Sequence, residues 1–214
     1  MTGAEFSALG DCALTLRLGT DMSDATSTRV IRTAGAITRA RIQGVTSVVP
    51  SYGTVGVHYD PVTIEFAEVC DRIAGAIAAA DEEVETRSEA VLHEIPIRYD
   101  GPDLDDVARG TGLTTDEVAE LHSAREYRVY VIGFVPGFGY LGKIDERLVL
   151  PRRDSPRRRV PAGSVAIAES QTGIYPSVTP GGWHLIGTTD VRLFDPLRDP
   201  PSLLRAGERV RFVL

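Results

Sequence analysis

Residues 130–142 read Tyr-Val-Ile-Gly-Phe-Val-Pro-Gly-Phe-Gly-Tyr-Leu-Gly, and the segment that they open runs to Trp183. Its later parts read Val-Pro-Ala-Gly-Ser-Val at 160–165, Gln-Thr-Gly-Ile-Tyr-Pro at 171–176 and Thr-Pro-Gly-Gly-Trp at 179–183. Glycine admits positive φ and close backbone approach, whereas proline fixes φ and removes a hydrogen-bond donor. This density of both predicts shaped loops between short strands, and loops on a rigid scaffold are where binding sites are usually built.

The C-terminal part of the chain has the pattern of a β-rich domain. Short β-prone runs alternate with Gly/Pro turns, and the runs are 127–132, 164–168, 184–187, 191–194 and 209–213. Many short strands with frequent turns are typical of a barrel or a sandwich. Two helices are expected just before these strands. Asp103 is placed to cap the first, over 104–110, and Thr114 with Glu117 has the spacing of a capping box that opens the second, which ends near Ser123.

The N-terminal part alternates strands and helices. Runs at 13–18, 45–49, 54–59 and 91–99 predict strands, and residues 23–41 and 63–80 predict amphipathic helices. Ser23 is the expected N-cap of the first helix, and residues 50–53 predict a hairpin turn. The β-α-β-β-α-β order is that of a ferredoxin-like α/β sandwich. The acidic residues between 80 and 90 predict a linker. We therefore expect an α+β chain with a small α/β domain over 1–90 and a β-rich domain over 91–214.

Composition excludes several classes of function. With 43% hydrophobic and 25% charged residues, the chain resembles an ordinary soluble protein. A formal net charge of −7 argues against nucleic acid or an anionic membrane as a general partner. Cys12 and Cys70 lie far apart and form neither a disulfide framework nor a zinc spacing. No signal-peptide pattern and no apolar run of membrane-spanning length occurs, so we expect a cytoplasmic protein.

Two features of the Gly/Pro-rich segment are suited to anionic groups. The backbone amides of 134–142 could form an anion-binding nest, although a tightly turned barrel corner is the alternative interpretation. Arg152, Arg153 and the three arginines at 157–159 form an island of positive charge in an acidic protein. Guanidinium forks match carboxylate and phosphate oxygens, although a solvated loop is again the alternative.

Neutral polar and aromatic residues complete the candidate site. Gln171, Thr172 and Tyr175 supply donors and acceptors suited to a small amide, and Trp183 could wall a pocket. His184 is the one candidate for acid–base catalysis, although a histidine beside a tryptophan is more often structural. No metal-ligand spacing occurs, so we expect no metal site. The candidate substrate-binding residues are Phe134, Pro136, Gly137, Tyr140, Arg152, Arg153, Gln171, Thr172, Tyr175, Gly181, Gly182 and Trp183.

At these residues the chain resembles the 5-oxoprolinase B subunit family, also called allophanate hydrolase subunit 1, which includes an inhibitor of a sporulation histidine kinase. The resemblance covers essentially the whole chain. The motifs that carry it are Gly10-Asp11, Pro-Ser-Tyr-Gly-Thr at 50–54, Tyr-Asp-Pro at 59–61, Ile-Pro-Ile-Arg-Tyr at 95–99, Gly-Pro-Asp-Leu at 101–104, Leu121-His122, the series over 132–183, Phe-Asp-Pro at 194–196 and Gly-Glu-Arg-Val-Arg-Phe at 207–212.

The resemblance implies a cyclophilin-like β-barrel after the small α/β domain. It also implies a second protein of related architecture (the 5-oxoprolinase C subunit, or allophanate hydrolase subunit 2) and a third (the A subunit). Similar paired domains form the carboxyltransferase unit of urea carboxylase-type enzymes. The implied reaction converts 5-oxo-L-proline to L-glutamate with ATP hydrolysis. ATP is consumed by the complex, and the resemblance does not assign it to one of the three proteins.

The chain departs from the family pattern at several positions. Members usually read Pro-Gly-Phe-Pro-Tyr-Leu-Gly-Gly, whereas this chain has Gly139 and Lys143 there, and Glu169 replaces a usual glycine. The usual Ile-Gly-Arg-Thr is Ile-Gly-Thr-Thr at 186–189. Two alternative functions therefore stay open at this point. One is the hydrolysis of allophanate, which like 5-oxoproline is a small amide with a carboxylate, and the other is inhibition of a sensor histidine kinase.

Overall fold

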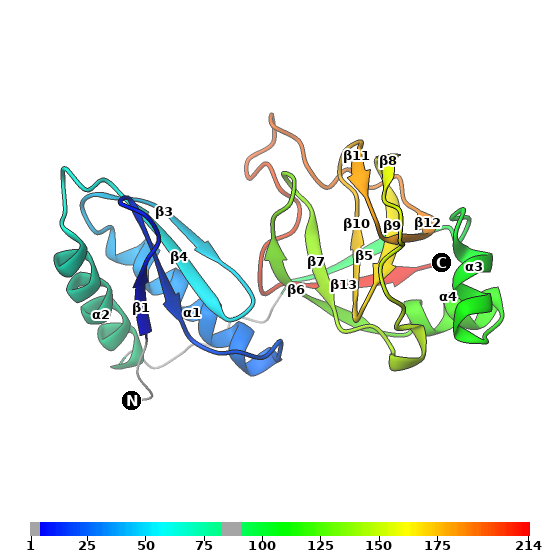
Figure 1. The fold of residues 1–214 in the computed structure, drawn as a ribbon, viewed down its shortest axis with the longest axis horizontal. Helices are drawn as coiled ribbons and strands as arrows, with labels where there is room; N and C mark the ends of the chain where they lie inside the picture. Colours follow the sequence, from blue (N-terminus) through cyan, green and yellow to red (C-terminus); the bar gives the residue numbers. More distant parts are fainter. Residues whose placement is uncertain (1–4, 83–90) are drawn as a thin grey trace. The chain divides into compact units, whose positions relative to one another are not determined.

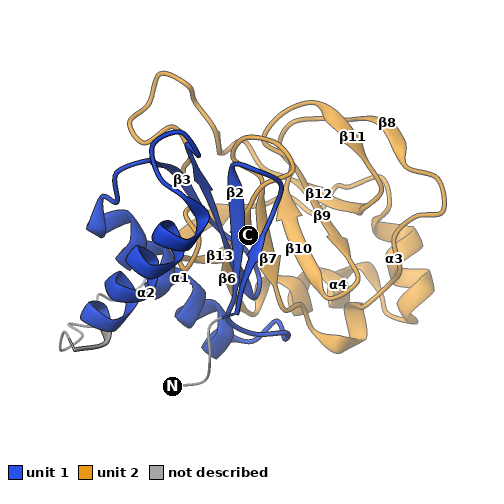
Figure 2. Ribbon diagram, turned by 60° about the vertical axis from the view of Figure 1, so that its left-hand side comes forward, with its two compact units in different colours: residues 1–89 blue, residues 90–214 orange. Residues whose placement is uncertain are grey.

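The computed structural model describes residues 5–82 and 91–214, and the chain divides into two compact units, residues 1–89 and 90–214 (Figures 1 and 2). The first unit has a four-stranded antiparallel sheet and two helices, and the second has a seven-stranded sheet curled into a half-barrel (Figure 1). The α+β class expected from the sequence is confirmed. The linker expected between residues 80 and 90 lies for the most part outside the described residues.

The first unit follows a simple alternation of buried and exposed positions. Its elements are β1 (Glu5–Ala8), β2 (Ala13–Arg17), α1 (Asp24–Ala40), β3 (Val45–Pro50), β4 (Thr54–Tyr59) and α2 (Phe66–Glu82). Leu14 and Leu16 on β2 are fully buried, as are Val55 and Val57 on β4. Because side chains alternate across a strand, these positions give the sheet one apolar face, which packs against α1 and α2 in a single core.

Local signals in the sequence set the ends of two helices. The Ser23 hydroxyl accepts a hydrogen bond from the Thr26 N–H at 3.2 Å, which satisfies a donor left unpaired at the start of α1. At the start of α4 (Thr115–Ser123), Thr114 and Glu117 form the expected reciprocal capping box. Both of these expectations are confirmed.

The β-α-β-β-α-β order expected for the first unit is wrong in its last strand. β5 (Leu92–Pro96) pairs in parallel with β13 (Arg209–Val213) in the sheet of the second unit. Ile95 is buried in the core of that unit, so the strand lies where its apolar side chain finds a partner. In the first sheet, whose order is β1-β2-β4-β3, the position beside β2 is filled by β1, a strand that the sequence patterns did not predict.

The second unit holds the remaining elements. They are β5, α3 (Leu104–Thr111), α4, β6 (Glu126–Ile132), β7 (Gly139–Gly142), the 3₁₀ turn η1 (Glu146–Leu148), β8 (Arg157–Val160), β9 (Ser164–Ala168), β10 (Gln171–Ile174), β11 (Thr179–Gly181), β12 (His184–Thr188) and β13. The large sheet has the order β12-β9-β10-β7-β6-β13-β5, and β8 with β11 forms a separate two-stranded ribbon.

Some of the strands expected in this unit differ from those observed. Residues 191–194 were expected to form a strand, but they contribute only an isolated bridge between Phe194 and Ser202. β7, β8, β10 and β11 were not expected, and three of these four contain glycine, which is unfavourable in an isolated strand. Their formation therefore depends on tertiary packing rather than on local propensity.

A histidine lies at the centre of the core of the second unit. His122 is completely buried, with Nδ1 2.8 Å from the Tyr99 hydroxyl and Nε2 2.8 Å from the Thr172 hydroxyl. The Thr172 hydroxyl donates its own proton to the Ala166 carbonyl, so Nε2 carries the ring proton and Nδ1 accepts from Tyr99. The ring also lies 4.5 Å from that of Phe212. Burial lowers the pKa of His122 from 6.5 to about 3, so the ring is neutral in the folded chain at ordinary pH.

Lowering the pH is expected to destabilise the second unit through His122. The folded ring takes up a proton only near pH 3, whereas the unfolded chain takes one up below about pH 6.5. Between these two values the unfolded state binds more protons, so the free energy of unfolding falls by up to about 1.4 kcal/mol for each pH unit that is lowered. Urea unfolding at a series of pH values, followed by the fluorescence of the single tryptophan, Trp183, measures this slope.

A comparison of variants isolates the contribution of His122 from that of the carboxylates. The His122→Gln variant should be less stable than wild type but should show a shallower pH dependence. The control is His58→Gln, which removes an exposed histidine from β4 and should keep the wild-type slope. Equal slopes in wild type and His122→Gln would show that the buried ring does not titrate as described.

Candidate functional site

Five aromatic side chains gather on the face of the β9–β10 strands that is turned away from the His122 core. Phe138 is central, with ring centroids at 4.9 Å from Tyr140, 5.3 Å from Tyr175, 5.6 Å from Trp183 and 5.6 Å from Phe134, all edge-to-face. This geometry is the preferred one for aromatic pairs. We call Phe134, Phe138, Tyr140, Tyr175 and Trp183 the aromatic cluster.

The strand β9 explains why the cluster has room to form. Val165 and Ile167 point into the main core of the second unit, whereas Ala166 and Ala168 point toward the aromatic cluster. The strand is therefore buried on both faces, with large side chains on one and small ones on the other. Alternating small residues leave space for rings that come from other strands.

Glycines let the rings of the cluster pack directly on backbone. A Cβ at Gly173 would lie 2.9 Å from Phe138 Cζ and 3.3 Å from Trp183 Cζ3. A Cβ at Gly181 would lie 2.8 Å from Tyr175 Cζ. Real Cβ atoms essentially never come within 3.0 Å of another heavy atom, so the contacts with Phe138 and Tyr175 require glycine at both positions in this packing.

The hydroxyl of Tyr175 lies among charged and polar groups at the edge of the cluster. Burial raises the pKa of Tyr175, and the Trp183 backbone N–H, which donates to the hydroxyl, acts in the opposite direction. The charges of Arg152 and Arg157 also lower this pKa, and the neighbouring Tyr140 raises it. The hydroxyl therefore stays protonated at neutral pH, with two guanidinium groups close to it.

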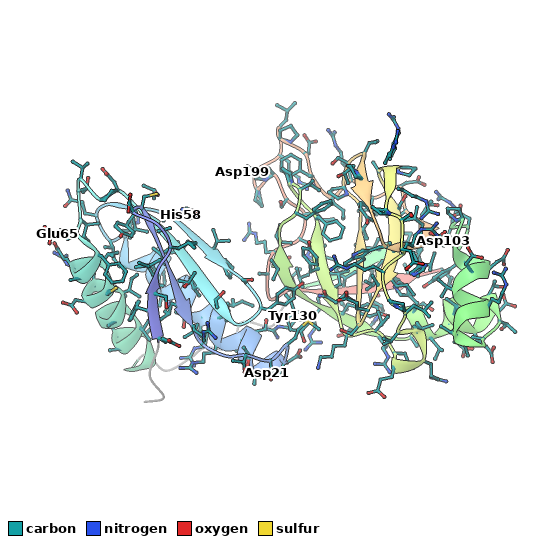
Figure 3. All side chains as sticks on the ribbon, viewed as in Figure 1. Asp21, His58, Glu65, Asp103, Tyr130 and Asp199 are labelled. Carbon is teal, nitrogen blue, oxygen red and sulfur yellow. The ribbon has the colours of Figure 1, made fainter. Side chains whose placement is uncertain are left out.

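A buried carboxylate binds two arginines next to these rings. Asp103 lies where the start of α3 meets β12 (Figure 3) and is 2% exposed. Its Oδ1 accepts hydrogen bonds from Arg153 Nη1 at 2.8 Å and from Arg157 Nη2 at 2.5 Å, and its Oδ2 accepts one from the Leu185 N–H at 2.7 Å. Burial raises the pKa of Asp103, but these three donors outweigh it and hold the pKa below its ordinary value. Asp103 is therefore ionised.

The expected role of Asp103 as a helix cap is wrong. Asp103 does occupy the N-cap position of α3, but its side chain makes no hydrogen bond to the first turn of that helix. Both carboxylate oxygens are already used by Arg153, Arg157 and the Leu185 N–H, which are stronger or equally good donors. The residue instead joins segments that lie far apart in the sequence.

Backbone contacts fix residues 151–156, which carry Arg152 and Arg153 and which we call the arginine loop. The Arg153 N–H donates to the Gly182 carbonyl at 2.9 Å. His184 Nε2 lies 2.9 Å from the Pro151 carbonyl oxygen, and because a carbonyl only accepts, Nε2 carries the proton. The other ring nitrogen, Nδ1, is buried with no hydrogen-bond partner in the described parts of the chain. His184 therefore holds the loop in place, and its remaining nitrogen is shielded from solvent.

Alternation along β10 separates two candidate residues. Gly173 and Tyr175 lie on the aromatic side, so Gln171 lies on that side as well. Thr172 lies on the opposite face, is 0% exposed, and uses its hydroxyl in the His122 network. The structure thus places Gln171 with the candidate site and Thr172 in the core.

The loop from Phe134 to Phe138 forms a tightly turned corner. The Val135 N–H donates to the Gly133 carbonyl and the Phe138 N–H donates to the Val135 carbonyl, while β7 begins at Gly139. These amides are used within the loop, which favours a barrel corner over an anion-binding nest. Phe134 has a φ of 67°, a left-handed conformation that is unusual for a bulky residue, and is 58% exposed.

The structure brings together most of the candidate residues, adds Phe138 to them, and gives Asp103 and Arg157 roles that the sequence did not indicate. Those that gather around the aromatic cluster and the arginine loop are Phe134, Tyr140, Arg152, Arg153, Gln171, Tyr175, Gly181, Gly182, Trp183 and His184. Pro136 and Gly137 lie in the corner loop, where Gly137 packs against Phe194. Asp103 and Arg157 owe these roles to the hydrogen bonds between them, and no local pattern links Asp103 to arginines so distant in sequence.

Neither a metal centre nor a membrane span is found among the residues that the structure describes. No group of three histidine, cysteine or carboxylate side chains in residues 5–82 and 91–214 is placed to hold a metal ion. Within the same ranges, every helix is too short or too polar to cross a bilayer.

Comparisons with known proteins give consistent results. Residues 4–204 match the family described as carboxyltransferase domain, subdomain C and D. The chain is 38% identical to the 5-oxoprolinase B subunit of Bacillus subtilis (strain 168), over 96% of this chain and 90% of that protein. It is 56% identical to the 5-oxoprolinase B subunit of Escherichia coli O157:H7, over 58% of this chain and 59% of that one. The crystal structure of TTHA0988 superposes with a TM-score of 0.84 at 42% identity, and covers 94% of this chain but only 39% of its own.

Replacing Gly181 by alanine is expected to disturb the aromatic cluster. The new Cβ would overlap the Tyr175 ring, so the ring or β11 must shift. Such overpacking should lower the free energy of unfolding by about 1–3 kcal/mol and change the near-UV circular dichroism of the aromatic residues. The adjacent Gly182→Ala variant is the matched control, because its Cβ would meet Pro156 Cβ at an ordinary 3.7 Å. Equal stability of the two variants would contradict this packing.

Proposed function

Because the chain belongs to the carboxyltransferase domain, subdomain C and D, family, we propose that it is the B subunit of a 5-oxoprolinase complex that converts 5-oxo-L-proline to L-glutamate with ATP hydrolysis. The observation that carries this proposal is the similarity, over 96% of the chain, to the Bacillus subtilis protein of that name. The relatives in Escherichia coli and Haemophilus influenzae bear the same name. Allophanate hydrolysis and kinase inhibition, the alternatives raised by the sequence, are not favoured by these relatives.

The proposed substrate carries two groups that this site can recognise. 5-Oxoproline has a ring amide and a carboxylate. In the proposed reaction the amide oxygen takes the terminal phosphoryl group of ATP, which releases ADP and makes the ring carbon electrophilic. One water then adds to that carbon and the ring C–N bond breaks, which frees the amine and leaves an acyl phosphate. A second water hydrolyses the acyl phosphate to the carboxylate of L-glutamate and inorganic phosphate. Each of these steps places negative charge on oxygen, which fixed donors stabilise.

The residues around the aromatic cluster can share these tasks. Arg152 and Arg153 would hold anionic oxygens, since guanidinium groups form charge-assisted hydrogen bonds with carboxylate and phosphate. The Gln171 amide and the Tyr175 hydroxyl would orient the lactam, because each both donates and accepts hydrogen bonds. The Trp183 ring would exclude water on one side of the bound ligand.

The proposed complex needs further proteins. We propose a second protein of related barrel architecture (the C subunit) and a third (the A subunit) as partners, as the family resemblance implies. ATP is a substrate of the whole complex in this proposal. No phosphate-binding Gly-Lys-Ser/Thr loop occurs in the sequence, so the nucleotide is not assigned to this chain.

Coupled turnover tests the proposal directly. The chain is purified together with its two candidate partners, and the release of ADP and glutamate is followed with 5-oxo-L-proline. Both products should appear with the complete complex and disappear when this chain is omitted. Ammonia release from allophanate, without turnover of 5-oxoproline, would show that allophanate is the substrate. If a stable complex released no product from either substrate, the proposal would be overturned.

Replacing Arg152 by alanine is expected to impair activity without affecting stability. Arg152 pairs with Glu169 at 3.3 Å, but both side chains are more than half exposed, so the pair contributes little to folding. Loss of a charge-assisted hydrogen bond to the ligand should lower kcat/KM about 10- to 100-fold. The control is Arg158→Ala, which removes an exposed charge from β8 and should leave kcat/KM near wild type. An unchanged kcat/KM in Arg152→Ala would exclude this residue from the site.

A further inference from the structure

The two arginines bound by Asp103 each use only part of their hydrogen-bonding capacity. Arg153 donates to Asp103 through Nη1, and Arg157 does so through Nη2. Arg153 Nε and Arg157 Nη1 are both shielded from solvent, and neither has an acceptor in the described parts of the chain. A buried donor without an acceptor costs about 1–3 kcal/mol, and native proteins rarely retain two such donors side by side. The pair therefore has two donors available for a further acceptor.

The cluster formed by Asp103, Arg153 and Arg157 also carries a net positive charge. Asp103 is the one carboxylate in the described residues that pairs with Arg153 or Arg157, so one negative charge faces two positive charges. Both guanidinium groups contact the same carboxylate oxygen, which brings them close enough to repel each other. A second anion at the free edges of the guanidinium groups would make the cluster neutral and would satisfy the remaining donors.

The surroundings limit the size and chemistry of that anion. Arg157 on β8 lies opposite Gly181 on β11, and Gly181 packs against the ring of Tyr175. The Arg153 N–H donates to the carbonyl of Gly182, the residue between Gly181 and Trp183 of the aromatic cluster. An anion bound by Arg157 would therefore lie near the Tyr175 hydroxyl, whose pKa the charge of this arginine lowers. A small molecule with a carboxylate on a compact, partly apolar body fits this combination.

We propose that Arg153 and Arg157, oriented by Asp103, form a binding site for the carboxylate of a small ligand. The inference rests on the proposed function in one respect, which is that 5-oxoproline supplies this carboxylate. Asp103 acts as the positioning residue, since it touches both guanidinium groups but not the ligand. It removes the rotational freedom of two long side chains before the ligand arrives, which reduces the entropy cost of binding.

The fork of each arginine is essential to this arrangement. One edge of the guanidinium group binds Asp103 while another faces the ligand, so a single residue serves both acceptors. Lysine keeps the positive charge but concentrates it on one nitrogen, and it cannot present two fixed edges. Arg157→Lys therefore keeps the positive charge but loses the fixed arrangement of two donor edges. It is also a milder change than removal of the buried Asp103 carboxylate.

Titration of the full-length chain tests the site without any requirement for turnover. With ¹⁵N-labelled arginine, the Nε–H signal of Arg153 is followed as 5-oxo-L-proline, acetate, inorganic phosphate or 2-pyrrolidone is added. The signal should shift and saturate with 5-oxo-L-proline and with acetate, and it should not move with 2-pyrrolidone, which is the lactam without the carboxylate. The Nε–H signal of Arg158 serves as the internal control and should not move. A saturable shift with phosphate alone, or with none of the four probes, would overturn the proposal.

Three variants test the role of the arginine pair and of Asp103. Arg157→Lys should weaken carboxylate binding about tenfold or more with the fold intact, whereas the control Arg158→Lys should bind as wild type. Asp103→Asn should decrease the shift of the Arg153 signal at saturation, because the guanidinium group is no longer fixed. If Asp103→Asn does not fold, Arg153→Lys tests the other arginine of the pair, with the Nε–H signal of Arg157 as the probe of carboxylate binding. Wild-type affinity in both lysine variants would overturn the proposal.

Kinetics of the assembled complex separate this inference from the proposed function. Arg157→Lys should raise KM for 5-oxo-L-proline about tenfold or more and change kcat less, as expected for a group that binds the carboxylate throughout the reaction. Turnover that is unaffected by Arg157→Lys would leave the proposed function standing and overturn the carboxylate site. An inactive complex in which this chain still binds acetate at Arg153 would overturn the proposed function and leave the carboxylate site standing.

Discussion

The direct packing of aromatic rings on glycine backbone is the constraint on which the candidate site depends. Phe138 and Trp183 contact the bare backbone of β10 at Gly173, and Tyr175 contacts that of β11 at Gly181. Any Cβ at these glycines would push the rings outward and would separate Tyr175 from the arginine loop. The glycines weaken β10 and β11 as isolated strands, but they allow the rings to come within the distances at which aromatic pairs attract each other. Local stability is therefore lost in favour of a fixed arrangement of side chains.

Asp103 connects this aromatic surface to the arginines. Burial of a carboxylate is unfavourable unless several donors compensate for its lost hydration, and here the donors are Arg153, Arg157 and the Leu185 N–H. Because they belong to the arginine loop, β8 and β12, removal of any one leaves the others with a poorly compensated charge. The network is therefore cooperative, and it fixes the positions of two long side chains that would otherwise be mobile.

Sequence patterns predicted the elements whose signals are local. The cap at Ser23, the capping box at Thr114 and the β-prone runs of β6 and β9 were found in this way, because each depends on residues within a few positions of one another. The parallel pairing of β5 with β13 joins residues more than a hundred positions apart, and nothing near β5 indicates its partner. The same holds for Asp103, whose position before a helix indicates a cap and gives no sign of the arginines. For the candidate site, residue chemistry singled out Gln171, Thr172 and Tyr175 together, but the sequence did not show that Thr172 faces the opposite side of β10.

The arginine pair, Arg153 and Arg157, is a local positive charge in a chain that is acidic as a whole. The formal net charge is −7, so the surface as a whole repels anions, and a positive group becomes selective when it is both local and fixed. Arg153 and Arg157 meet both conditions, because Asp103 orients them and leaves one positive charge in excess. Asp103 lies 50 and 54 positions from Arg153 and Arg157 in the sequence, so their arrangement exists only in the folded chain. A ligand that binds there binds the native state and not the unfolded one, and its binding free energy adds to the stability of the second unit.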